Sequence, residues 1–266
     1  MGKREVGTGG QYQNAAAHCQ LLRLSKVDRV LAWLFPFHCV LCGAGAAGMD
    51  LCAACCRDLP WLEGVCEWCA MPLQGSGPCV ACAAQPPCTR SCQVAVVYEY
   101  PVDRLITALK FRKQVYLSRV LGELLALHLL RQKSMLSRPT LVLPVPLHRD
   151  RRKQRGYNQA ALIADTVSRA LQLPCLPDAL QRVRATPTQT GLGRQGRLKN
   201  LRDAFAVRLD VVDAHVALVD DVITTGATTT ACAEALLAAG AATVDVWAVA
   251  RALRTSSGVG GNGQFD

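Results

Sequence analysis

The sequence lacks a long uninterrupted apolar segment. Its most apolar stretch, residues 227–250, is interrupted by Glu234 and Asp245, so we expect no membrane insertion. Charge is also scarce: 19% of the residues are charged and 50% are hydrophobic, a balance that excludes a wholly disordered chain and a coiled coil. The 266 residues suffice for one sizeable α/β domain and a small appended domain.

A cleavable leader is not expected. Residues 30–37 form a short apolar run followed by small residues, as in a secretory signal peptide. Cleavage there would remove or isolate Cys39 and Cys42, which belong to the most regular pattern of the chain. We therefore expect a cytoplasmic protein.

Composition divides the chain into four segments. Cysteine, glycine and proline dominate the region up to Cys92, which cannot form an ordinary hydrophobic core. Beyond it, strand-like and helix-like patterns alternate. The predicted segments are a flexible N-terminus at 1–30, a cysteine-built module at 31–92, an α/β domain at 93–254 and a flexible tail at 255–266.

The cysteine spacing indicates a duplicated metal-binding unit. Eleven of the fourteen cysteines lie between Cys39 and Cys92, where two Cys-x-x-Cys pairs separated by nine residues recur with a shift of 27 residues. Four thiolates can surround Zn²⁺ tetrahedrally at about 2.3 Å, in a closed structural site. The predicted ligands of two structural zinc ions are Cys39, Cys42, Cys52, Cys55, Cys66, Cys69, Cys79 and Cys82.

Several alternatives remain open at this point. An iron–sulfur cluster also takes four cysteines, and a disulfide framework would need an oxidising compartment. The repeat favours one metal per unit, although interleaved pairing of the Cys-x-x-Cys pairs is not excluded by the spacing. Eight thiolates and two zinc ions together contribute four negative charges, which lowers the formal net charge of +10 to about +6.

The second half has the alternation of a parallel α/β sheet. Short runs of apolar and β-branched residues predict strands, and leucine or alanine stripes predict helices. The predicted strands cover 94–98, 140–145, 214–219 and 243–250, and the predicted helices cover 102–131, 158–171 and 227–239.

A phosphate-binding loop is predicted after the strand at 214–219. Two carboxylates end the strand, and a turn of hydroxyl residues and glycine opens the next helix, whose free N–H groups attract anions. No Gly-Lys-Ser/Thr follows, so a Walker loop is excluded. The candidate residues are Asp220 and Asp221 for sugar hydroxyls or a hard cation, and Thr224, Thr225, Gly226, Ala227 and Thr228 for phosphate.

Two basic segments accompany this loop. Residues 148–159, interpreted as a loop leaving a parallel strand, would reach the same sheet edge, where Arg149, Arg152 and Arg155 could bind a second phosphate group. Single-stranded DNA binding and a solvated face are the alternatives. The second segment, 182–202, contains Arg197 and is either a mobile lid or a linker.

The phosphate-loop residues resemble the phosphoribosyl pyrophosphate (PRPP) loop of type I phosphoribosyltransferases. The cysteine module together with Leu109–Arg112, Pro144–Arg149, Arg155–Gln159, and Thr188 with Arg197 is similar to the ComF family. The resemblance spans about residues 39–250 and implies a duplicated zinc ribbon before a phosphoribosyltransferase-like α/β domain.

The resemblance also implies a function. It predicts PRPP as ligand, Mg²⁺ bound with it, and catalytic roles for Asp220, Asp221 and Arg197. It links the chain to uptake of single-stranded DNA in competent bacteria, with other DNA-uptake proteins such as a helicase as partners. Three hypotheses follow: a Mg²⁺-dependent phosphoribosyltransferase, a PRPP-sensing module that binds single-stranded DNA, and a zinc-organised adaptor.

Overall fold

The computed structural model describes residues 37–75, 77–132, 138–183 and 204–253. The predicted flexible ends at 1–30 and 255–266 lie outside the described residues, as does most of the basic segment 182–202 with Arg197.

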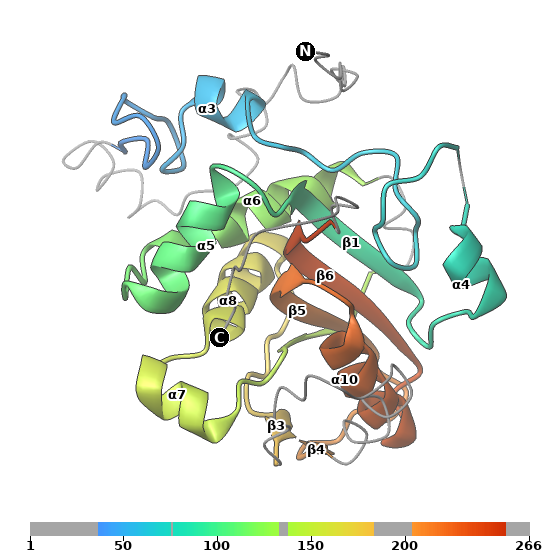
Figure 1. Cartoon of the computed structure of the whole chain (residues 1–266). Helices are drawn as coiled ribbons and strands as arrows, with labels where there is room; N and C mark the ends of the chain where they lie inside the picture. The colour runs from blue at the N-terminus through green and yellow to red at the C-terminus, as the bar shows by residue number, and fades with distance from the viewer. Residues whose placement is uncertain (1–36, 76, 133–137, 184–203, 254–266) are drawn as a thin grey trace, which may run out of the picture.

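A four-stranded parallel sheet forms the centre of the α/β domain, in the order β1-β6-β5-β2 (Figure 1). The central strands β5 and β6 pair from His215 opposite Thr243 to Ile223 opposite Arg251. Both are buried along most of their length, as expected for parallel strands covered on two faces. The strands are β1 (Ser91–Val97), β2 (Leu141–Pro144), β5 (His215–Ile223) and β6 (Thr243–Arg251).

Helices cover both faces of this sheet (Figure 1). Along β5, Ala217 and Val219 pack in the cluster that holds the leucine-rich helices, while Val216 and Leu218 pack toward the opposite helix. This alternation follows from the two-residue period of a strand. One layer consists of α5 (Val102–Phe111), α6 (Leu117–Arg131) and α8 (Gln159–Leu171); the other contains α10 (Ala227–Ala238) and the antiparallel pair β3 (Leu180–Arg182) and β4 (Phe205–Val207).

The sequence predictions need four corrections. The single helix expected over 102–131 is two helices, because Lys113 adopts a left-handed conformation at φ 56° and turns the chain. The leucine pattern continued across this turn because both helices face the core. The basic stretch interpreted as a loop contains a short helix, α7 (Arg149–Arg155), and the pair β3–β4 was not expected. The strand expected to stop at residue 219 continues to Ile223.

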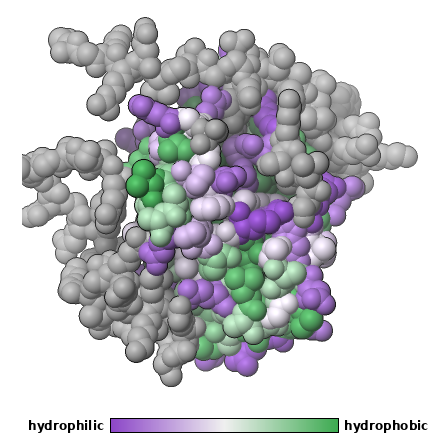
Figure 2. Space-filling model, turned by 90° about the vertical axis from the view of Figure 1, so that its right-hand side faces the viewer, coloured by the Kyte–Doolittle hydropathy of each residue, from purple (hydrophilic) through white to green (hydrophobic). Residues whose placement is uncertain are grey.

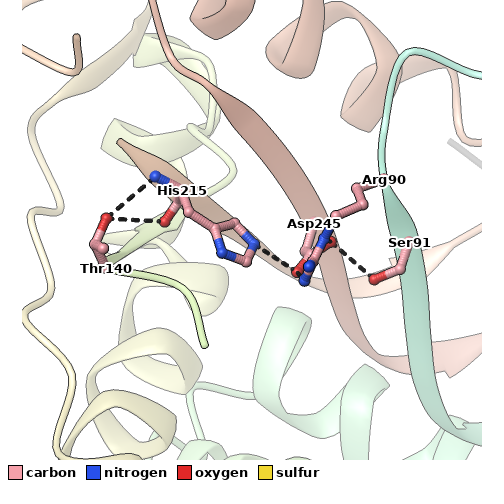
Figure 3. A network of polar contacts seen from close by, with 5 residues as sticks. All are labelled: Arg90, Ser91, Thr140, His215 and Asp245. Carbon is pink, nitrogen blue, oxygen red and sulfur yellow. Dashed lines mark hydrogen bonds and ion pairs between the residues drawn. The ribbon is translucent and has the colours of Figure 1, made fainter. Parts of the chain in front are cut away.

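A buried ion network fastens the sheet at its amino-terminal edge (Figure 3). Asp245 on β6 accepts hydrogen bonds from Arg90 at 2.9 and 2.5 Å and from the Ser91 hydroxyl at 2.8 Å. It also lies 2.8 Å from Nε2 of His215. Burial opposes ionisation, but these partners hold the pKa of Asp245 below its usual value. Arg90 immediately precedes β1, so this network ties the end of the cysteine module to the sheet.

The cysteine module lies along the helical layer and the β1 edge rather than forming a separate globule (Figure 1). Its main chain reaches β1 through hydrogen bonds from Leu62 N to the Ala95 carbonyl and from Val97 N to the Pro60 carbonyl. It contains two short helices, α3 (Ala53–Arg57) and α4 (Val80–Ala84). On the face shown in Figure 2, hydrophilic and hydrophobic side chains are interspersed. The side chain of Val80 on α4 is 88% exposed and does not pack in a hydrophobic core.

Candidate functional site

The eight predicted ligands form two separate groups of four sulfurs. Within each group, all sulfur atoms lie within 4.8 Å of one another. The Cys42 and Cys52 sulfurs are 3.7 Å apart, and so are those of Cys69 and Cys79. A tetrahedral zinc site with bonds of about 2.3 Å requires a sulfur–sulfur separation of roughly 3.8 Å, whereas a disulfide requires about 2.05 Å. The geometry therefore fits two zinc ions.

The structure shows which cysteines come together in each group of four. One group contains Cys39, Cys42, Cys52 and Cys55, and the other contains Cys66, Cys69, Cys79 and Cys82, so each metal site lies within one repeat. The 27-residue shift also relates the bridge between His38 and Gly45 to that between Val65 and Pro72, and it relates α3 to α4. We call 38–57 the first ribbon unit and 65–84 the second ribbon unit.

Backbone N–H groups stabilise the thiolates of both units. Cys55 N donates to the Cys52 sulfur at 3.4 Å, and Cys79 N donates to the Cys66 sulfur at 3.3 Å. Burial raises the pKa of Cys39 and Cys66, but backbone hydrogen bonds outweigh it and lower the values to about 6 and about 7. One thiol of each set therefore loses its proton more readily than an ordinary cysteine.

The segment predicted to bind phosphate lies between β5 and α10, and its binding role stays a prediction. Gly226 is the residue before α10 and has φ 78°, a left-handed conformation that glycine adopts readily. Gly226 itself provides no side-chain cap, and the Thr225 hydroxyl accepts a hydrogen bond of 3.4 Å from the Ala227 N–H. Thr224 and Thr225 are exposed. Thr229 is turned inward and donates to the Gly226 carbonyl at 2.9 Å, which closes the turn. The loop therefore presents hydroxyl and N–H donors to solvent at the positive end of a helix dipole.

The two acids lie on opposite faces of β5, because the strand continues through them. Asp221 is 3% exposed and forms an ion pair with Lys110 of α5. Asp220 lies on the face of the sheet that carries α10. Burial is the main cause that raises the pKa of Cys232 on α10, and the negative charge of Asp220 is the second. Burial, and next the charge of Asp221, raise the pKa of Asp220 well above its usual value. A bound cation would favour the ionised form of Asp220.

The end of α5 meets α7 and α8 beside Asp221. Arg155 lies over the Phe111 ring at 5.4 Å and donates to Gln159 at 2.6 Å. Burial lowers the pKa of Arg155, and the charge of Asp221 is the largest influence that opposes this shift. The Tyr157 hydroxyl donates to the Leu109 carbonyl, which fixes the end of α5 against α8. Phe111 and Gln159 thus fix the Arg155 side chain, which lies within electrostatic range of Asp221.

Other predicted residues are placed differently. Arg149 and Arg152 are exposed on α7, and their phosphate-binding role stays a prediction. Arg197 lies outside the described residues. Sequence reasoning assigned no role to Lys110, although it stands in a motif that carried the family resemblance. It also missed Arg251, whose only sequence signal is an arginine at the end of an apolar strand.

Comparisons with known proteins bear on the cysteine module and on the family of the chain. Residues 30–83 match the model of the double zinc ribbon domain. DNA utilization protein YhgH of Escherichia coli O157:H7 is 36% identical over 223 residues, which cover 82% of this chain and 98% of that protein. Competence protein F of Haemophilus influenzae is 34% identical over 226 residues, with the same coverage. Among solved structures, UMP synthase of Leishmania donovani matches 53% of this chain and 22% of its own at 15% identity, and the TM-score of 0.29 is too low to bear on fold or function.

The structure defines a parallel α/β domain fastened to a double zinc ribbon. The similarity over nearly the full length of these relatives shows that the chain belongs to the ComF family of competence protein F. Among the residues that the structure describes, no helix is long and apolar enough to cross a membrane.

Proposed function

We propose that this protein binds PRPP at the loop between β5 and α10 and acts in the uptake or processing of single-stranded DNA. The observation that carries the first part is the start of α10, where the exposed Thr224 and Thr225 follow Asp220 and Asp221 and only a weak 3.4 Å contact from Ala227 N–H to the Thr225 hydroxyl occupies a donor. The loop would hold the ribose 5-phosphate, and the acids would hold the ribose hydroxyls. The second part rests on family membership and on the printed names of the relatives.

Arg155 would contact the pyrophosphate group, because it is within electrostatic range of Asp221 and is already held by Gln159 and Phe111. Arg149 and Arg152 extend the positive charge of α7 outward. Asp220 and Asp221 also supply the oxygen donors that suit Mg²⁺, which when bound with PRPP would neutralise charge on the departing pyrophosphate. Transfer to an acceptor would make the protein a phosphoribosyltransferase, while binding without transfer would make it a sensor.

Calorimetry of the zinc-loaded full chain tests this proposal. We expect PRPP to bind with Mg²⁺ more tightly than ribose 5-phosphate or pyrophosphate alone, because the two phosphate groups contact different ends of the site. Pyrophosphate release with a panel of bases would then identify a transferase, whereas binding without release would favour the sensor. Absence of PRPP heat with and without Mg²⁺ would contradict the proposal.

A specific surface favours single-stranded DNA as a second ligand. Phe111 and Tyr116 are 65% and 57% exposed at the turn between α5 and α6. Between them, Arg112 and Lys113 are exposed as well. Aromatic rings that stack on bases, with cations beside them for the phosphates, are the usual means of binding a single strand. We call Phe111, Arg112, Lys113 and Tyr116 the aromatic–basic surface.

Fluorescence anisotropy with a labelled oligothymidine tests this surface. Tyr116→Ala with Phe111→Ala is expected to weaken binding about 10-fold or more, because each stacked base contributes roughly 1–3 kcal/mol. Arg112→Ala should reduce the slope of log affinity against log salt by about 0.7. The exposed, distant Val212→Ala serves as the control and should leave both unchanged. Equal affinity of the aromatic double variant and the control would contradict this binding site.

A further inference from the structure

A buried arginine joins the phosphate loop to the second ribbon unit. Arg251 ends β6 and is 6% exposed. Its Nη1 donates to the Ile223 carbonyl at 2.8 Å and also to the Thr224 carbonyl. Its Nε donates to the Cys69 carbonyl at 3.0 Å. One rigid guanidinium therefore contacts the first residues of the loop and a zinc-ligand residue at the same time.

Apolar packing reaches the same place independently. Ile223, immediately before the loop, lies in a buried cluster with Ala70 of the second ribbon unit and with Val94 and Ala248 of the sheet. The Cys92 N–H donates to the Glu67 carbonyl at 2.7 Å, which holds the Cys66–Cys69 turn against β1. The turn that carries two zinc ligands is thus part of the surface on which the loop begins.

The first ribbon unit has different neighbours. Its Asp50 forms an ion pair with Arg119 of α6, and the guanidinium of Arg119 lies 5.3 Å from the Phe37 ring. Met49 and Leu51 pack in the cluster of α5 and α6. The two units therefore have similar metal sites but fasten different parts of the domain.

We propose that Arg251 is a positioning residue through which the second ribbon unit, with its metal bound, fixes the phosphate loop. Without the metal, the Cys66–Cys69 turn loses the tetrahedral site that orders it, and the Cys69 carbonyl no longer holds one side of the guanidinium. The carbonyls of Ile223 and Thr224 then lose a fixed donor. The loop would then be free to leave the conformation in which its N–H groups could bind phosphate. This part of the inference rests on the proposed function of the loop.

Hydrogen exchange of the full chain, without ligand, tests this coupling. Arg251→Met and Cys66→Ser with Cys69→Ser are each expected to speed exchange at 222–230 by about 10-fold or more, because loss of local contacts lowers the free energy of local opening. Arg251→Lys should lie between, since lysine keeps the charge but not the fork of donors. Slow exchange in α8 would show that each variant is folded.

Two controls separate the coupling from general destabilisation. Cys39→Ser with Cys42→Ser removes the metal site of the first ribbon unit, and Arg169→Met removes an exposed arginine paired with Asp165. Both should leave exchange at 222–230 within about 2-fold of the parent chain. If Arg251→Met leaves this exchange unchanged, or if the first-unit variant speeds it equally, the coupling is wrong. Calorimetry with PRPP on the same samples reports separately on whether the loop binds that ligand.

Discussion

Replacing Asp220 and Asp221 together by asparagine is expected to abolish detectable PRPP binding in calorimetry. A hydrogen bond to a charged group contributes about 1.5–3 kcal/mol, so loss of two such acceptors predicts an affinity at least about 100-fold lower. The acids lie on opposite faces of β5, and each single variant should therefore retain part of the affinity. Asp221→Asn also leaves Lys110 without its charged partner.

The matched control is Asp178→Asn, an exposed acid away from the loop. It should bind PRPP as the parent chain does. Circular dichroism of the double variant should show a folded protein, because burial already raises the pKa of Asp220 and so disfavours its charged form. Unchanged PRPP affinity in a folded double variant would remove the acid pair from the site.

Purified, reduced protein is expected to contain two zinc ions per chain. Zinc sites of this type contribute an apparent 10–16 kcal/mol to folding of isolated fingers at neutral pH, in addition to the contacts that the ribbon units make with the α/β domain. A strong chelator should therefore remove both metals and unfold the units, which near-ultraviolet circular dichroism would detect through Trp61 and Trp68. Elemental analysis gives the stoichiometry directly.

Cysteine variants test which thiols hold the metal. Cys66→Ser with Cys69→Ser should lower the stoichiometry to one zinc, because it removes half of one ligand set. Cys88→Ser should leave it at two, because Cys88 lies outside both sets and its sulfur contacts the Thr230 carbonyl instead. Zinc close to zero in reduced parent protein, or one zinc in the Cys88 variant, would contradict the assignment.

Much of the metal site and of the sheet could be predicted from the sequence, because both follow from local spacing. The 27-residue repeat indicated which cysteines share a metal, and the strand-to-helix pattern located the loop. What spacing could not show were contacts between distant segments. The pairing of Lys110 with Asp221 and that of Arg251 with Cys69 join residues far apart in the chain, and both depend on the finished sheet.

Secondary-structure errors had equally physical causes. A stripe of leucines continued from α5 into α6 because both helices face the same core, so the periodicity did not mark the turn at Lys113. Two adjacent acids in a sequence suggest the end of a buried strand. The strand β5 nevertheless continues through Asp220 and Asp221, because Lys110 balances the charge of Asp221. The prediction therefore ended the strand four residues too early, at residue 219 instead of Ile223, and did not place the two carboxylates on opposite faces of the sheet.

The strand β6 has a charged side chain near each end of its buried length. Asp245 binds the segment that enters β1, and Arg251 binds the segment that leaves β5. Between them the strand is apolar, and its side chains, Trp247 among them, are buried. A slip of β6 by one residue would turn both ions to the wrong face and break both contacts at once. The alignment of the whole sheet is thus specified by two charges as well as by hydrophobic packing.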